Sequence, residues 1–158
     1  MYAVIMAGGS GTRFWPASRR SRPKQFLNII GQNSMIVETR DRLMPLVDDE
    51  ETILVLGREH MREARDLFKD RNVHLIGEPV GRNTAPCIGL GAVYAQHLGC
   101  KSPLAFLPAD HYIGNTAAFL KALRASGKLA EAGGLVTLGI VPSRPETGYG
   151  YIRRGLRK

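Results

Sequence analysis

Five short apolar runs recur along the chain, with more polar stretches between them. The runs are YAVIMA (2–7), TILVLG (52–57), VHLIGE (73–78), LAFLPA (104–109) and LVTLGIV (135–141). Strands buried on both faces of a parallel sheet have this composition, because neither face meets water. Each run therefore predicts a strand.

One segment with a helical pattern lies between each consecutive pair of runs. These segments are 35–44, which follows Ser34, then 59–69, 84–98 and 116–132. Alternating strands and helices are typical of βαβ units. The pattern predicts an α/β fold, a three-layer α/β/α sandwich with a mostly parallel, Rossmann-like sheet. No repeat or linker divides the chain, so residues 1–158 are expected to belong to one domain.

The end of the chain departs from this regularity. Residues 148–152 predict a strand or an extended segment, but only six residues follow them. A strand needs a hydrogen-bonded partner, which so short a remainder cannot supply. We therefore expect the sheet to be incomplete at its C-terminal side.

The net charge of +8 is concentrated in two places. Residues 1–37 contain five cations and no acid, and the last six residues contain four cations and no acid. Nucleic-acid-binding proteins more often spread a basic stripe over one face, and no stacking aromatic residues interleave with the basic ones here. The distribution favours a small polyanionic ligand over nucleic acid.

Other protein classes are excluded by what the sequence lacks. No run of about 18 apolar residues could span a membrane, and the N-terminus has no secretory signal. The sequence therefore predicts a cytoplasmic protein without a membrane partner. Cys87 and Cys100 form no CxxC motif and have no clustered histidines. They are expected to be small buried thiols rather than zinc ligands.

A glycine-rich loop, AGGSGTRFWP, follows the first predicted strand. Its glycines, Gly8, Gly9 and Gly11, allow positive φ and a close approach of the backbone to a ligand. Successive N–H groups in such a loop can bind an anion, and Arg13 and Lys24 add positive charge. The lysine of the P-loop and the last glycine of the dinucleotide fingerprint are both absent. The loop predicts a phosphate site of another kind.

The stretch GGSGTRFWPASRRSRPKQF resembles the signature of the sugar-nucleotide pyrophosphorylases. Its FWP and PKQF segments are similar to those of the mannose-1-phosphate guanylyltransferases, or GDP-mannose pyrophosphorylases. Three further stretches agree in the expected order, namely EPVGRNTAP (78–86), LPADH (107–111) and RPETGYGYI (144–152). The resemblance covers the whole chain and implies the nucleotide-diphospho-sugar transferase type of fold.

The resemblance also implies a reaction, in which GTP and mannose 1-phosphate give GDP-mannose and pyrophosphate. Arg13 and Lys24 would be catalytic, and Asp110 would hold Mg²⁺. The positions implied for nucleotide binding are Ala7, Gly8, Gly9, Ser10, Gly11, Thr12, Arg13, Glu78, Arg82, Asn83 and Thr84. Those implied for the sugar are Thr147, Gly148, Tyr149 and Gly150. A homo-oligomer is compatible with the family, but the sequence does not give the oligomeric state.

Each of these motifs also has a plainer interpretation. Asp110 could cap a helix, although a carboxylate that ends a strand near a phosphate loop is a natural Mg²⁺ ligand. Asn83 or Thr84 could cap the helix that follows, with Pro86 tolerated in its first turn. Residues 147–150 could be an edge segment with a glycine bulge.

Three alternatives to GDP-mannose synthesis remain open. The chain could be a pyrophosphorylase for another sugar 1-phosphate and nucleotide, or a truncated nucleotide-binding or regulatory fragment without activity. A nucleic-acid-binding module is the third. Catalytic domains of the resembled family run well beyond the TGYGYI motif, so we expect this length to bind nucleotide weakly and to turn over poorly.

Overall fold

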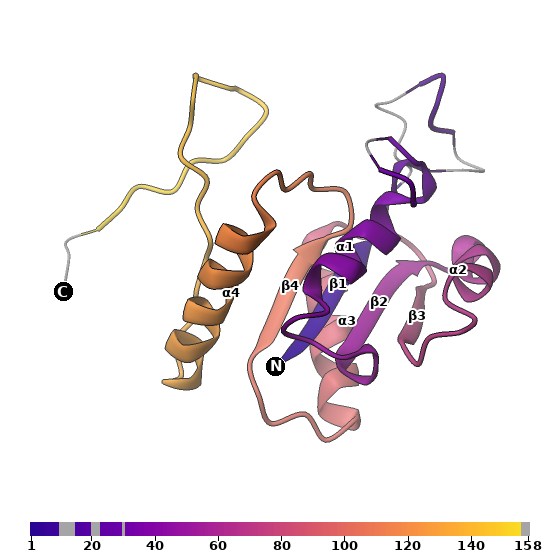
Figure 1. The fold of residues 1–158 in the computed structure, drawn as a ribbon, viewed down its shortest axis with the longest axis horizontal. Helices are drawn as coiled ribbons and strands as arrows, with labels where there is room; N and C mark the ends of the chain where they lie inside the picture. Colours follow the sequence, from indigo (N-terminus) through magenta and orange to yellow (C-terminus); the bar gives the residue numbers. More distant parts are fainter. Residues whose placement is uncertain (10–14, 20–22, 30, 156–158) are drawn as a thin grey trace.

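The structure, a computed structural model, describes residues 1–9, 15–19, 23–29 and 31–155. It forms an α/β unit with a four-stranded sheet at its centre (Figure 1). The strands are β1 (Tyr2–Ala7), β2 (Thr52–Gly57), β3 (His74–Glu78) and β4 (Leu104–Pro108). The α-helices are α1 (Met35–Leu43), α2 (Met61–Leu67), α3 (Thr84–His97) and α4 (Thr116–Glu131). The 3-10 turns are η2 (Lys24–Phe26), η3 (Asp49–Glu51) and η4 (Arg58–His60).

The sheet has the strand order β3-β2-β1-β4, and all three neighbouring pairs are parallel. The chain first adds β2 and β3 on one side of β1 and then places β4 on the other side. The strand order therefore reverses between β1 and β4, and ligands of open α/β sheets bind beyond the carboxyl ends of the strands at such a point.

Both faces of the sheet are covered, as the apolar strand runs predict. Alternate residues of β1 enter two separate cores, since successive side chains of a strand point to opposite faces. Ile5 packs with Ile36 of α1 and Leu123 of α4 in one core. Val4 packs with Cys87 of α3 in the other. The three-layer arrangement is confirmed, with α1, α2 and α4 against one face and α3 against the other (Figure 1).

The fifth predicted strand is wrong. Residues 135–141 form no strand, and Leu135, Ile140 and Val141 are largely exposed. Residues 148–152 form no strand either. The segment that carries them leaves the end of α4 and lies beyond that helix, away from the sheet (Figure 1). An apolar run becomes a strand only when a neighbouring strand accepts its hydrogen bonds, and these residues have none among the described parts of the chain.

Two further expectations can be compared with the described residues. Cys87 is a buried free thiol, as expected, whereas Cys100 is only half-buried. No helix in the described ranges is long and apolar enough to cross a bilayer.

Candidate functional site

The carboxyl ends of β1 and β4 lie side by side and create the candidate site. The ladder between them continues one step past the end of β4, because the Ala109 N–H donates to the Met6 carbonyl at 3.0 Å. Gly8 and Gly9 follow β1 at this level, and Asp110 follows β4. Gly9 has φ +102°, a conformation that glycine adopts without strain. The glycine loop thus begins beside the predicted metal ligand.

Lys24 reaches this edge from the turn η2. The turn is held down by Phe26, which is buried in the core, and by Gln25, whose Nε2 donates to the carbonyl of Ala7 at 2.6 Å. Lys24 Nζ then lies 3.0 Å from Asp110 Oδ2. Lys24 and Asp110, for which the family resemblance implies catalysis and metal binding, are 86 positions apart in the chain and meet across the end of the sheet.

The backbone that carries Asp110 is fixed from α1. Thr39 Oγ1 donates to the Ala109 carbonyl at 3.1 Å, in a buried position. The Lys24 and Asp110 side chains themselves remain partly exposed, at 20% and 42%. Ion pairs this accessible to water contribute only about 0–1 kcal/mol to stability. The pair can therefore separate at little cost when a phosphate or a cation competes for its members.

The donor set fits Mg²⁺ only in part. Mg²⁺ is usually bound through one or two carboxylates, with phosphate oxygens and water completing its octahedron. Asp110 offers one accessible carboxylate at the edge where a phosphate would lie. Within the described ranges, no group of three or more His, Cys, Asp or Glu side chains comes together to hold a metal. A metal held here would depend on the nucleotide for most of its ligands.

Glu78 ends β3 and lies against the glycine loop. Its carboxylate reaches Gly8 so closely that a Cβ at position 8 would be 2.9 Å from Oε2. The side chain is buried, and this burial raises the pKa of the Glu78 carboxyl. Burial, followed by the negative charge of Glu78, also raises the pKa of the Cys87 thiol to about 11. Glu78, Gly8 and Cys87 therefore form one compact cluster at this end of the sheet.

The connection from β3 to α3 is exposed and conformationally unusual. Arg82, Asn83 and Thr84 are all exposed. Asn83 occupies the N-cap position of α3 with φ 66° and ψ −165°, and its side chain makes no capping hydrogen bond. Asn83 thus occupies the N-cap position, as the plainer interpretation allowed, but without a side-chain cap, and Pro86 lies in the first turn. That region of φ and ψ is adopted almost only by glycine, and non-glycine residues found there cluster at functional sites.

The predicted sugar residues lie apart from this edge. Residues 147–150 belong to the exposed segment beyond α4 (Figure 1), where Glu146 organises a local turn. The Glu146 N–H donates to the Tyr151 hydroxyl at 2.7 Å, and the Gly148 N–H donates to Glu146 Oε1 at 3.2 Å. The structure does not bring Tyr149 to Lys24 or Asp110, and the sugar-binding role remains a prediction.

Ser10, Gly11, Thr12 and Arg13 lie outside the described residues. Conversely, the sequence interpretation assigned no role to Gln25 or Thr39, which hold the edge together. Gln25, which stands between Lys24 and Phe26, gave one weak signal. An amide that is buried beside the phenylalanine needs a hydrogen-bond partner. Thr39 lies within an ordinary helical pattern and gave none.

The chain is similar to known proteins over nearly its whole length. The nucleotidyl transferase family profile matches residues 2–158. Mannose-1-phosphate guanylyltransferase of Klebsiella pneumoniae is 49% identical over 157 residues, which cover 97% of this chain and 33% of that protein. The Escherichia coli protein of the same name is 47% identical over 156 residues, with the same coverage of both chains. The chain therefore spans about a third of the length of these relatives.

A solved structure shows the same architecture. The crystal structure of a Thermus thermophilus protein described as mannose-1-phosphate geranyltransferase superposes with a TM-score of 0.91 at 44% identity. The match covers 99% of this chain and 46% of that one. The family profile, the sequence identity and the parallel sheet with its glycine loop lead to one conclusion: the chain belongs to the nucleotidyl transferase family.

Proposed function

We propose that the chain is the nucleotide-binding part of an enzyme that transfers a guanylyl group from GTP to mannose 1-phosphate, forming GDP-mannose and pyrophosphate. The observation that carries the proposal is the meeting of Lys24 and Asp110, 3.0 Å apart, beside Gly8 at the point where the strand order reverses. The names of the similar proteins support the choice of substrates.

The reaction requires little covalent chemistry from the protein. An oxygen of the sugar phosphate attacks the α-phosphorus of GTP in line, and pyrophosphate leaves from the opposite side. The attacking oxygen is already ionised near neutral pH, so no general base is needed. Catalysis then depends on holding the two phosphates in line and on neutralising charge in the transition state.

Lys24 is suited to neutralising charge in the transition state. Its ammonium exchanges the Asp110 carboxylate for phosphate oxygens and bridges the α-phosphate and the incoming sugar phosphate. The N–H groups of Gly8 and Gly9, with Arg13, receive the β- and γ-phosphates. Asp110 would hold Mg²⁺, and a bound Mg²⁺ would supply Lewis-acid polarisation of the phosphoryl group. Glu78 and residues 82–84 lie toward the nucleoside.

Binding of GTP to this chain tests the proposal. We expect calorimetry in the presence of Mg²⁺ to show binding of GTP in preference to ATP. Lys24→Ala should weaken it by at least about tenfold, because hydrogen bonds to charged groups contribute on the order of 1.5–3 kcal/mol. Lys69→Ala removes an exposed lysine beyond α2 and is the matched control. Equal binding of GTP and ATP, or an unchanged affinity in the Lys24 variant, would contradict the proposal.

One observation favours a second candidate, nucleotide binding without transfer. Residues 147–150 lie away from Lys24 and Asp110, so the predicted sugar residues do not complete the candidate phosphate site. Release of pyrophosphate from GTP with mannose 1-phosphate distinguishes the two. Turnover that depends on Lys24 and Asp110 supports transfer, whereas GTP binding with no turnover supports the second candidate.

A further inference from the structure

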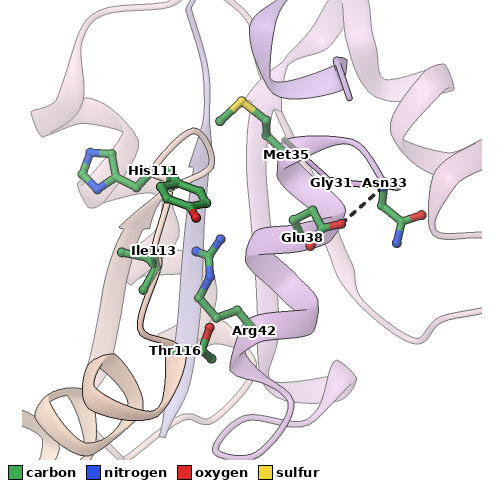
Figure 2. A pocket seen from close by; sticks show the side chains of 9 residues that line it. Gly31, Asn33, Met35, Glu38, Arg42, His111, Ile113 and Thr116 are labelled. Carbon is green, nitrogen blue, oxygen red and sulfur yellow. Dashed lines mark hydrogen bonds between the residues drawn. The ribbon is translucent and has the colours of Figure 1, made fainter. Parts of the chain in front are cut away.

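A pocket of about 210 Å³ opens on the α1 side of the sheet (Figure 2). Its walls come from the segment that precedes α1, from α1 itself and from the connection between β4 and α4. Asn33, Arg42 and Thr116 contribute polar groups, and Tyr112 and Ile113 contribute apolar surface. Neither the sequence motifs nor the proposed reaction uses these residues.

The guanidinium of Arg42 is the principal charged group of the pocket without a bonded partner. It makes no hydrogen bond or salt bridge to another residue in the described ranges, although Glu38 lies one helical turn away on α1. Burial lowers the pKa of Arg42 by more than the nearby Glu38 carboxylate raises it. The loss of hydration around this cation is therefore only partly offset by the Glu38 carboxylate.

Glu38 is occupied elsewhere. The Asn33 N–H donates to Glu38 Oε1 at 3.3 Å. Figure 2 shows the Glu38 side chain pointing toward Asn33, while Arg42 points into the space beside Thr116 and Ile113. The carboxylate thus holds the segment before α1 and leaves the guanidinium facing the opening. An arginine in this situation presents its paired N–H donors to an anion.

We propose that this pocket binds a phosphate monoester of about the size of one sugar ring. Arg42 pairs with two phosphate oxygens, and the Thr116 hydroxyl offers a hydrogen bond to a phosphate or sugar oxygen. Tyr112 and Ile113 line the wall that faces the carbon skeleton. The volume is below the roughly 300–1,000 Å³ typical of sites for larger organic ligands, so a nucleotide is too big.

The site does not rest on the proposed guanylyl transfer. The pocket is, however, close in the sequence to the candidate metal ligand, because His111, which also lines the pocket, directly follows Asp110. The phosphate could come from free inorganic phosphate or from a sugar phosphate, and the experiment separates these sources.

Amide chemical shifts of the isotope-labelled chain provide the test. Glucose 6-phosphate is the main probe, with inorganic phosphate and neutral glucose as comparisons. We expect glucose 6-phosphate to shift the amides of residues 31–35 and 111–116, and to bind more tightly than inorganic phosphate. Neutral glucose should leave these amides unchanged. Equal binding of the two phosphates would limit the site to free phosphate and would overturn the monoester proposal, as would binding of glucose alone.

Substitutions of single residues test whether Arg42 binds the phosphate. Arg42→Ala should weaken binding at these amides by at least about tenfold, while Arg42→Lys retains part of it as a point charge. Arg65→Ala removes an exposed arginine of α2 and should change nothing. Lys24→Ala should also leave this binding intact, so a failure of the proposed nucleotide site is distinguishable from a failure here. No shift at residues 31–35 and 111–116, or shifts that persist in Arg42→Ala, would overturn the proposal.

Discussion

Two glycines of α3, two residues apart, provide a direct test of how this helix packs. Gly91 lies against β1, where an added Cβ would be 2.6 Å from Val4 Cγ1 and 3.4 Å from Phe106 Cε1. Gly89 lies on the exposed side of the same helix, and an added Cβ would meet nothing within 4 Å. The same substitution, glycine to alanine, should therefore have opposite effects at the two positions.

The magnitudes follow from two opposing terms. Alanine in place of glycine stabilises a helix interior by roughly 1 kcal/mol, and Gly89→Ala should show most of this gain. Gly91→Ala gains the same amount but forces overpacking, which costs about 1–3 kcal/mol. Val4 is fully buried in a central strand, and its branched side chain is stiff, so we expect the upper half of that range. The net effect is a loss of about 1–2 kcal/mol.

Urea denaturation followed by circular dichroism measures both variants. The midpoint should rise for Gly89→Ala and fall for Gly91→Ala, with unchanged slopes. Val4→Ala in the Gly91→Ala background should recover part of the loss, because it removes the atom that collides. A gain in Gly91→Ala equal to that in Gly89→Ala would show that α3 does not pack against β1 at this distance.

Three further predictions concern the end of the sheet. Glu78→Gln should raise the urea midpoint at pH 7. Burial raises the folded-state pKa of Glu78, so the free energy of unfolding of the wild type falls as the pH rises above the ordinary carboxyl pKa of 4.5. The gain should shrink below about pH 4, where the carboxyl is protonated in both states. Cys87, whose thiol pKa is about 11, should react slowly with a disulfide reagent at pH 8, while half-buried Cys100 reacts fast. Asn83→Gly should raise the free energy of unfolding, measured by thermal denaturation, by roughly 1 kcal/mol, because glycine adopts φ 66° without strain.

Each of these predictions has a control. Asp66→Asn neutralises an exposed carboxylate on α2 and should leave the stability at pH 7 nearly unchanged; a gain equal to that of Glu78→Gln would mean that burial is not the cause. Cys100→Ser should abolish the fast thiol reaction, and a remaining fast phase would place Cys87 in contact with water. Asn83→Ala keeps a Cβ and should bring no gain. Equal stabilisation by alanine and glycine would remove the argument from backbone strain.

The apolar runs of the sequence are sufficient to determine the first four strands, and the segments between them the four helices. A strand buried on both faces can contain few polar residues, so its pattern is visible without knowledge of its neighbours. The same reasoning fails for LVTLGIV at 135–141. Its composition is that of a strand, but whether a run becomes a strand depends on a partner elsewhere in the chain, which composition does not reveal.

For the candidate site, too, one part could be predicted from the sequence and another part depends on the tertiary structure. The sequence alone predicts phosphate binding for Gly8 and Lys24 and metal binding for Asp110, because glycines and a carboxylate stand at strand ends and cations follow the first strand. It could not show that β4 lies beside β1, and only this adjacency brings Lys24 within 3.0 Å of Asp110. The approach of Glu78 to Gly8 and the pocket around Arg42 likewise depend on contacts between distant segments. Residue chemistry is local and can be read from the sequence, whereas proximity is set by the order of strands in the sheet.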